Sequence, residues 1–299
     1  MFASQIRAGY SLARHSKSLY RPMTYACFSS AEKPLVTITG VEGFLGSQTL
    51  LQLSQDGGYR IRGTIREGTT DEHMAPIKAA IGKAYDDIEI VKAEMTEEAS
   101  ISNSIKGSTY VIHHAAPYFF NNKTLDELVR PSVEGTLSVM RACTDNNVKR
   151  LVATSSIAAI RNTAKADSPP DGVYDETYWS NPDRPEGIVD YAVGKTMAER
   201  AAWEYVEKTP GCFEVVMINP VLIIGPSIAF GGGVSEKFVE SLIHNERPSN
   251  KPAGNGYVDV REVAAAHIAG MKVPEANGKR FLLQSDERTK KEIATMLRE

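Results

Sequence analysis

Two residues whose types and spacing could support proton transfer are Tyr191 and Lys195. They stand four positions apart in a stretch, 191–207, with helical periodicity, so both side chains fall on one helical face. A phenol with a pKa of about 10 is a weak acid at neutral pH, but a neighbouring ammonium group favours the phenolate. The pair could therefore protonate a carbonyl oxygen, although YxxxK taken alone also fits a surface pair with no role.

Hydroxyl side chains lie upstream of this helix, where a predicted strand at 150–154 ends. Ser156 is available there to hydrogen-bond a reacting oxygen, and Ser155 is the close alternative. Ligand crevices in open α/β sheets lie beyond the carboxyl ends of the strands, which is where both serines are expected. The run lacks a G-x-S-x-G elbow, so a serine nucleophile is not supported.

Three glycines follow the first apolar strand in the spacing GxxGxxG and open a helix. Gly40 permits a tight turn, Gly43 lets the backbone approach a pyrophosphate, and Gly46 allows the helix to pack closely on the strand. The phosphates would then lie against the helix N-terminus, which favours negative charge. The order strand, loop, helix predicts a dinucleotide site, whose contacts in this loop are Gly40, Gly43, Phe44, Leu45 and Gly46.

Two charged residues bear on the cofactor that this loop would hold. We expect Glu42 to point out to solvent, because a carboxylate near a pyrophosphate is repelled. Arg66 stands at the end of the second strand, where an acid that binds a ribose is usual. A guanidinium pairs bidentately with phosphate, so Arg66 predicts NADPH rather than NADH. An exposed arginine without a ligand is the alternative, and Glu67 beside it keeps the preference open.

The histidines and cysteines give little indication of a metal. His113 and His114 end a predicted strand, and neighbouring residues of a strand face opposite sides. No cluster of ligands accompanies them, so we expect no metal site. The cysteines lie far apart and lack CxxC spacing, which is typical of a reducing compartment, and their positions are Cys27, Cys143 and Cys212.

The elements that must position these residues alternate between short β-branched runs and longer helical patterns. This order is typical of βαβ units and a parallel sheet covered on both faces. Six strands are predicted before Pro220, at 35–39, 59–65, 88–91, 110–113, 150–154 and 213–218. Beyond it come helices at 234–244 and 260–271 and a strand at 280–283. We therefore expect an α/β fold: a Rossmann-type doubly wound parallel sheet over 33–225 and a small C-terminal substrate lobe, 226–299, interleaved with it.

Residues 1–32 differ from the rest of the chain. They are rich in serine and arginine, and their first acidic residue is Glu32. This composition predicts a mitochondrial transit peptide, and a disordered tail on a cytoplasmic protein is the alternative. The chain has 34 basic and 37 acidic residues among 299, and no apolar run is long enough to span a bilayer. We expect neither nucleic acid nor membrane as a partner.

Taken together, these motifs resemble the extended short-chain dehydrogenase/reductases, the NAD-dependent epimerase/dehydratase family. The resemblance is to the branch of dihydroflavonol 4-reductase, cinnamoyl-CoA reductase and yeast-type methylglyoxal reductase, and it covers 33–298. It rests on TGVEGFLG at 39–46, HHAAP at 113–117, RPSVEGTLSVMRAC at 130–143, TSS at 154–156, YAVGK at 191–195, INPVLIIGP at 218–226 and YVDVREVAAAH at 257–267.

The resemblance implies roles for individual residues of the reaction centre. Ser156, Tyr191 and Lys195 would form the catalytic triad, with Lys195 also holding the nicotinamide ribose. Ala115 and Pro220 would line the nicotinamide side.

The resemblance also implies contacts at the adenosine end. Arg66 would contact the 2′-phosphate, and Glu94 stands where the family usually has an aspartate near adenine. Glu42 is a second departure, since the family has a small residue there. Family members often pair through two long helices, here 125–146 and 191–207, so we expect a homodimer.

The function that follows is NADPH-dependent reduction of an aldehyde or ketone, reversible as alcohol oxidation, with Tyr191 as general acid. The enzyme class is an NAD(P)-dependent oxidoreductase acting on CH–OH groups, and the partner is a small carbonyl compound. Aromatic residues at 118–120 and Trp179 fit an apolar substrate or simple packing equally well. A nucleotide-sugar epimerase or dehydratase is one alternative, and a non-catalytic NAD(P)-binding subunit of a mitochondrial complex is another.

Overall fold

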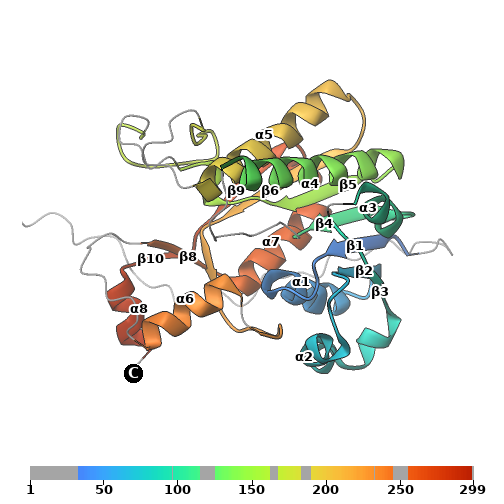
Figure 1. The fold of residues 1–299 in the computed structure, drawn as a ribbon, viewed down its shortest axis with the longest axis horizontal. Helices are drawn as coiled ribbons and strands as arrows, with labels where there is room; N and C mark the ends of the chain where they lie inside the picture. Colours follow the sequence, from blue (N-terminus) through green and yellow to red (C-terminus); the bar gives the residue numbers. More distant parts are fainter. Residues whose placement is uncertain are drawn as a thin grey trace, which may run out of the picture. The chain divides into compact units, whose positions relative to one another are not determined.

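Seven short strands, most of them rich in apolar residues, form one parallel sheet at the centre of residues 33–299, seen in the computed structural model of Figure 1. Every neighbouring pair is parallel, in the order β3-β2-β1-β4-β5-β6-β9. The strands are β1 (Leu35–Thr39), β2 (Arg60–Ile65), β3 (Ile88–Lys92), β4 (Tyr110–His113), β5 (Arg150–Thr154), β6 (Glu214–Pro220) and β9 (Lys279–Leu283). The first six follow the doubly wound Rossmann order, which confirms the predicted fold class.

Side chains alternate across this sheet and build a separate apolar core on each face. Val152 and Val216 belong to one buried cluster, whereas Leu151 and Val215, their neighbours in sequence, belong to the other. This alternation follows from the two-residue period of a strand. Because both faces are covered by helices, each strand can be apolar throughout.

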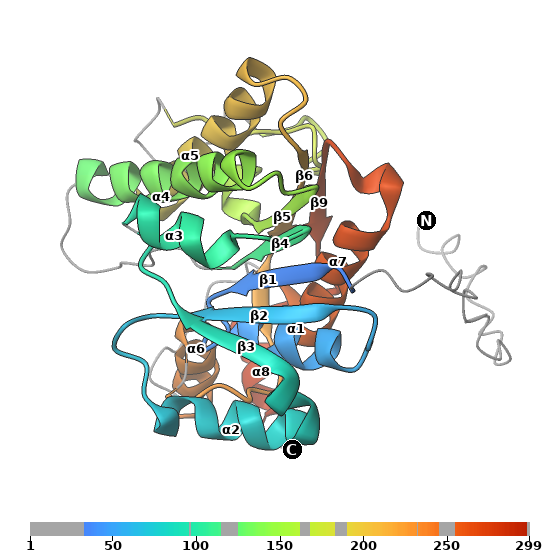
Figure 2. The same ribbon diagram turned by 90° about the vertical axis from the view of Figure 1, so that its right-hand side faces the viewer.

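Helices cover the two faces in two groups (Figures 1 and 2). On one face, α1 (Phe44–Ser54) packs against α7 (Val260–Lys272), and α2 (Asp71–Ile81) lies beside α1. On the other face lie α3 (Glu98–Ile105), α4 (Leu125–Asp145) and α5 (Asp190–Lys208). The loops that enter α1 and α5 start from β1 and β5, which pair with the two sides of β4 in the same sheet.

A second, smaller sheet of three strands forms from residues that follow β6. Its order is β10-β8-β7, and its elements, with their helices, are β7 (Leu222–Ile224), α6 (Val234–Ile243), β8 (Asn255–Asp259), β10 (Asp286–Arg288) and α8 (Lys290–Met296). The predicted lobe 226–299 is divided, because α7 and β9 belong to the main sheet's layers. The main sheet consequently has seven strands, one more than the six predicted before Pro220.

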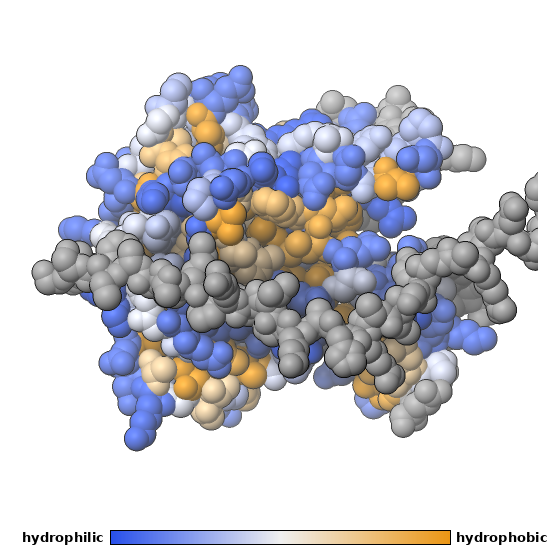
Figure 3. All heavy atoms as spheres, turned by 180° about the vertical axis from the view of Figure 1, so that it is seen from behind, coloured by the Kyte–Doolittle hydropathy of each residue, from blue (hydrophilic) through white to orange (hydrophobic). Residues whose placement is uncertain are grey.

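The structure describes residues 33–95, 97–114, 125–161, 168–182, 190–231, 233–244 and 255–297. The predicted transit peptide, 1–32, lies outside this range and stays a prediction. Short 3-10 helices complete the fold, at Gly82–Asp87 (η1), Ile157–Ala159 (η2) and Pro274–Ala276 (η4). No helix among the described residues could span a membrane. Figure 3 shows one face of the surface, on which apolar side chains gather between two polar regions.

Candidate active site

The glycine-rich loop makes a sharp turn between β1 and α1. Gly40 adopts a φ of 71°, a left-handed conformation that a Cβ atom disfavours. Its N–H donates to the carbonyl oxygen of Thr64 at 3.1 Å, and the N–H of Val41 donates to the same oxygen at 3.0 Å. The turn expected at Gly40 is confirmed, and it anchors the loop to β2.

The N-terminus of α1 is open and closely packed on this loop. A Cβ atom on Gly46 would lie 2.1 Å from the carbonyl oxygen of Gly40, so only glycine allows this approach. Gly43 is the N-cap, and neither a capping side chain nor an acidic residue of the first turn occupies the helix end. Backbone N–H groups and the helix dipole there favour an anion. Phe44 and Leu45 lie in this first turn.

Glu42 does not point out to solvent, contrary to the sequence-based expectation. Its side chain is only 9% exposed, and its Oε1 accepts hydrogen bonds from Arg66 Nε at 3.0 Å and from the Arg66 backbone N–H at 3.3 Å. The reason is the positive charge of Arg66, which attracts the carboxylate to the end of β2. The Arg66 side chain itself is 77% exposed.

The other predicted cofactor contacts lie at the carboxyl ends of further strands. Glu94 follows β3, where its backbone N–H donates to Ser100 Oγ at 3.0 Å. Pro220 is the buried last residue of β6 and pairs with Leu283 of β9. Ala115 lies outside the described residues, so its contact stays a prediction. Glu94 and Pro220 therefore both lie at the carboxyl ends of the strands, where α/β proteins bind ligands.

The three predicted catalytic residues lie on α5 and at the start of η2, two elements that pack against each other next to the carboxyl end of β5. Lys195 Nζ donates to the carbonyl oxygen of Thr154 at 3.4 Å, two residues before Ser156. Ser156 begins η2, and its Oγ accepts the N–H of Ala158 at 3.1 Å. Tyr191 lies one turn before Lys195 on α5, whose first turns pack against η2.

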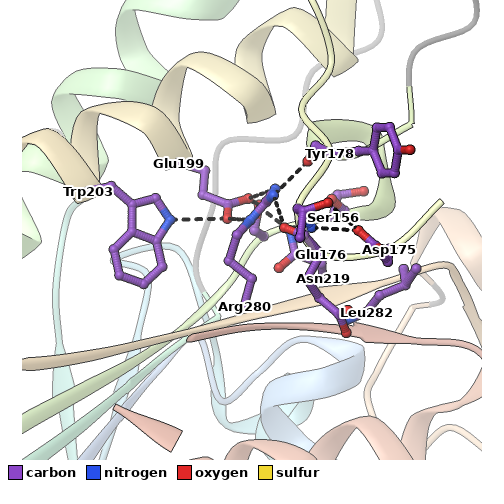
Figure 4. Close-up of polar contacts among 11 residues, drawn as sticks. Ser156, Asp175, Glu176, Tyr178, Glu199, Trp203, Asn219, Arg280 and Leu282 are labelled. Carbon is purple, nitrogen blue, oxygen red and sulfur yellow. Dashed lines mark hydrogen bonds and ion pairs between the residues drawn. The ribbon is translucent and has the colours of Figure 1, made fainter. Parts of the chain in front are cut away.

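A buried polar network behind Ser156 was not predicted from the sequence (Figure 4). Glu199 of α5 is its centre: one carboxylate oxygen accepts Ser155 Oγ at 2.5 Å and Asn219 Nδ2 at 2.8 Å. The same Asn219 amide donates to the backbone oxygen of Ser156 at 3.2 Å. Trp203 Nε1 donates to the other carboxylate oxygen at 3.3 Å. The network thereby ties α5 to the ends of β5 and β6.

Arg280 of β9 supplies the positive charge of this network. Its Nε donates to Glu199 at 2.6 Å, and the two side chains are 8% and 1% exposed. Its Nη1 donates to the carbonyl oxygens of Glu176 and Tyr178 at 2.8 and 2.7 Å. The ring of Trp179 stacks on the guanidinium, 3.7 Å from the ring centroid. Trp179 therefore packs within the structure, which favours the packing interpretation over a substrate contact for this residue.

Two histidines, His114 and His267, lie on either side of the Thr154 hydroxyl, and a third, His113, contacts Thr39. His267 Nδ1 donates to the carbonyl oxygen of Val263 at 2.8 Å, so its Nε2 accepts from Thr154 Oγ1 at 2.8 Å. Thr154 Oγ1 in turn accepts from His114 Nδ1 at 2.8 Å. His113 Nδ1 lies 2.8 Å from Thr39 Oγ1.

These histidines are held in the neutral form. Burial lowers the pKa of His113 to about 3, with a further contribution from the charge of Lys195, and burial lowers that of His267 to about 4. Burial and then the neighbouring His267 hold the pKa of His114 well below its usual range. Among the described residues, no group of three or more His, Cys, Asp or Glu side chains is placed to hold a metal ion.

Comparison with known proteins identifies the family to which the chain belongs. The model of the NAD dependent epimerase/dehydratase family matches residues 36–283, which is most of the chain. The chain belongs to that family. As the motifs predicted, it falls in the reductase branch of these extended short-chain dehydrogenase/reductases, and it is an NAD(P)-dependent oxidoreductase.

Three relatives illustrate the branch of this family member. Cinnamoyl-CoA reductase 1 of Petunia hybrida is 32% identical over 259 residues, 86% of this chain and 74% of that protein. The bifunctional dihydroflavonol 4-reductase/flavanone 4-reductase of Pyrus communis is 30% identical over 278 residues, 90% and 77% of the two chains. The yeast methylglyoxal/isovaleraldehyde reductase, solved with NADPH, has a TM-score of 0.72 and 25% identity over 85% and 78%.

The residues of this family member fit a nicotinamide dinucleotide. The uncapped N-terminus of α1, the turn at Gly40 and the close approach at Gly46 form a cradle that a Cβ atom would fill. Such a cradle suits a pyrophosphate, because it offers backbone N–H groups, while the carboxylate of Glu42 in the same loop is engaged by Arg66.

Proposed function

We propose that this protein reduces a small aldehyde or ketone to the alcohol, reversibly, with NADPH as the preferred cofactor. The observation that supports this best is the contact of Lys195 with the Thr154 carbonyl oxygen, on a helix that also carries Tyr191 and packs against the turn after Ser156, in a chain of the reductase branch. The nicotinamide, when bound, supplies or accepts the hydride. The protein's own residues would bind the carbonyl oxygen and manage its proton.

Tyr191 is proposed as the general acid that protonates the carbonyl oxygen. Lys195 lies one helical turn later on the same face of α5, so both side chains can face the same reacting group. Ser156 would hydrogen-bond the same oxygen. Ser155 is the weaker candidate, because its hydroxyl already donates to Glu199 at 2.5 Å.

The preference for NADPH rests on Arg66. Its guanidinium is largely exposed at the end of β2, where Rossmann folds contact the adenosine ribose. Of the guanidinium nitrogens, Nε donates to Glu42, and among the described residues the two terminal nitrogens have no hydrogen-bond partner, so they would be available to a 2′-phosphate.

The test is turnover with a panel of aldehydes, ketones and aromatic carbonyls, followed by the loss of NADPH or NADH absorbance. We expect a carbonyl in the panel to be reduced, and Tyr191→Phe to lower kcat by a factor of about 10² or more while cofactor affinity stays unchanged. Tyr205→Phe is the matched control, because this tyrosine lies on the same helix and its hydroxyl forms a hydrogen bond with Thr144 of α4. Cofactor binding without any turnover would favour the epimerase or non-catalytic functions.

A further inference from the structure

Glu42 brings a carboxylate to the point at which Rossmann folds distinguish NADP from NAD. It belongs to the glycine-rich loop, yet its Oε1 lies 3.0 Å from Arg66 Nε and 3.3 Å from the Arg66 backbone nitrogen. It thus reaches the end of β2, where other Rossmann proteins place either an acid for the ribose 2′-hydroxyl or an arginine for the 2′-phosphate. In this chain an acid and an arginine lie together at this position: Glu42 comes from the glycine-rich loop and Arg66 from the end of β2.

The second carboxylate oxygen of Glu42 is left without a partner. Oε2 is buried and accepts no hydrogen bond from any described residue, while the side chain as a whole is 9% exposed. Buried acceptors without a donor are uncommon and carry a desolvation cost. A ribose hydroxyl is a donor of the kind that this oxygen lacks, whereas a 2′-phosphate brings only further negative charge.

Glu67, the neighbouring acid, does not share this position. Its carboxylate accepts from Lys92 Nζ at 3.2 Å, and the two side chains are both largely exposed. Glu67 is therefore engaged with β3 and is screened by solvent. The carboxylate that competes for Arg66 is that of Glu42.

We propose that Glu42 is a specificity-determining residue: it lowers the selectivity for NADP over NAD and lets the protein use NAD(H) as well. Its carboxylate takes the Nε of Arg66, repels a 2′-phosphate and offers an acceptor to a 2′-hydroxyl. This inference rests on the proposed function only in assuming that Arg66 faces the adenosine ribose. The selectivity between NADP and NAD would then depend on the glycine-rich loop as well as on the end of β2.

Direct cofactor binding to the full-length protein tests the inference without any carbonyl substrate. The dissociation constants of NADPH and NADH are measured by calorimetry for the wild type, Glu42→Gln and Glu67→Gln. Glu42→Gln keeps an oxygen that can accept from the Arg66 N–H, so the loop should retain its shape. We expect the ratio of the NADH to the NADPH dissociation constant to rise about tenfold or more in Glu42→Gln, because like charges no longer face each other. Glu67→Gln should leave the ratio unchanged.

A second pair of probes isolates the 2′-phosphate. Adenosine 2′,5′-bisphosphate and AMP differ only in that group, and Glu42→Ala should strengthen the binding of the first relative to the second. Unchanged ratios in both Glu42 variants would overturn the inference even if carbonyls are reduced. A shifted ratio in a protein that reduces no carbonyl would support the inference and overturn the proposed reaction instead.

Discussion

Glu199 is the buried residue on which the hydroxyl, amide and guanidinium groups behind Ser156 converge. Its carboxylate binds Ser155, Asn219 and Arg280, all of them buried or nearly so. A buried charge that loses its partner is left uncompensated, and the penalty exceeds the net value of the pair. Glu199 is linked to the backbone of Ser156 through the Asn219 amide, which donates to both.

We predict that Glu199→Gln lowers the free energy of unfolding by about 3–5 kcal/mol, since it leaves the Arg280 guanidinium buried and unpaired. Arg280→Met should cost a similar amount. The double variant should cost less than the sum of the two, with a coupling of about 1–3 kcal/mol measured by urea denaturation. Additive effects would show that the two side chains do not act as a pair. Glu204→Gln, on the exposed side of the same helix, should change stability by less than about 0.5 kcal/mol.

The spacing of Tyr191 and Lys195 lies within one helical turn, so the sequence alone suggests that their side chains face the same way. The choice of Ser156 over Ser155, and the role of all three as a triad, came from the resemblance to the family and stay a prediction. The pairing of Glu42 with Arg66 joins positions 24 residues apart, and that of Glu199 with Arg280 joins positions 81 apart. Such contacts depend on strand order and register, which the sequence pattern does not specify.

At the scale of elements, the packing of α1 on its loop leaves no room for a side chain at position 46. We predict that Gly46→Ala lowers stability by about 1–3 kcal/mol through overpacking against the Gly40 carbonyl. The same displacement of the loop should weaken NADPH binding about tenfold, a loss of roughly 1.4 kcal/mol, in calorimetry. Gly135→Ala is the control, because its Cβ would meet no atom within 4 Å. Unchanged cofactor affinity in Gly46→Ala would separate this loop from the cofactor site.

The C-terminus of α7 is held by an arginine from the sheet. The Arg150 side chain is 4% exposed, pairs with Glu214, and donates to the carbonyl oxygens of Gly270, Met271 and Val273 at 2.9, 3.1 and 2.6 Å. The last carbonyl groups of a helix have no partner within the helix, so a guanidinium satisfies several of them at once.

We predict that Arg150→Met lowers the free energy of unfolding by about 3–5 kcal/mol, because several buried carbonyl groups and Glu214 lose their donor together. In thermal unfolding this corresponds to a decrease in Tm of about 10 °C for a domain of this size. Lys149→Met, at the exposed neighbouring position, should have almost no effect. A small loss in Arg150→Met would mean that water replaces the guanidinium at the helix end.

The long apolar strands were predicted to within about two residues of their observed ends, because a parallel strand buried on both faces is a continuous apolar run. The short strands β7, β8 and β10 were not predicted. They are three to five residues long and only partly buried: β7 is apolar but has three residues, and β8 and β10 contain polar residues without a continuous apolar run. The place of β9 in the main sheet was also missed, since the sequence shows a strand without showing its neighbour.

At the scale of the whole molecule, α4 and α5 pack together on one side of the sheet and offer an outer surface (Figure 2). We predict that the protein is a homodimer through these helices and sediments as such at micromolar concentration. Met197 is an exposed apolar side chain of α5, so Met197→Glu should shift the population toward monomer by placing a charge in the interface. Met296→Glu, on α8, is the control. A wild type that sediments only as a monomer would contradict this prediction.

The buried histidines give the whole fold a dependence on pH. His113, His114 and His267 have pKa values below the ordinary 6.5 in the folded state because burial disfavours the imidazolium. The unfolded chain takes up these protons as the pH falls through about 6.5, whereas the folded protein does not. Stability is therefore complete above this pH and decreases as the pH falls toward the folded-state values of about 3 and about 4 for His113 and His267.

We predict that the free energy of unfolding decreases by up to about 4 kcal/mol per pH unit near pH 5, or about 1.4 kcal/mol per unit for each of the three histidines. Urea denaturation between about pH 7 and pH 5 measures this slope, in a range where few carboxylates titrate. His267→Gln should reduce the slope by about one third whatever its effect on stability at neutral pH. His244→Gln is the control and should leave the slope unchanged, because His244 is exposed to solvent. An equal slope in all three proteins would show that His267 takes up a proton without unfolding.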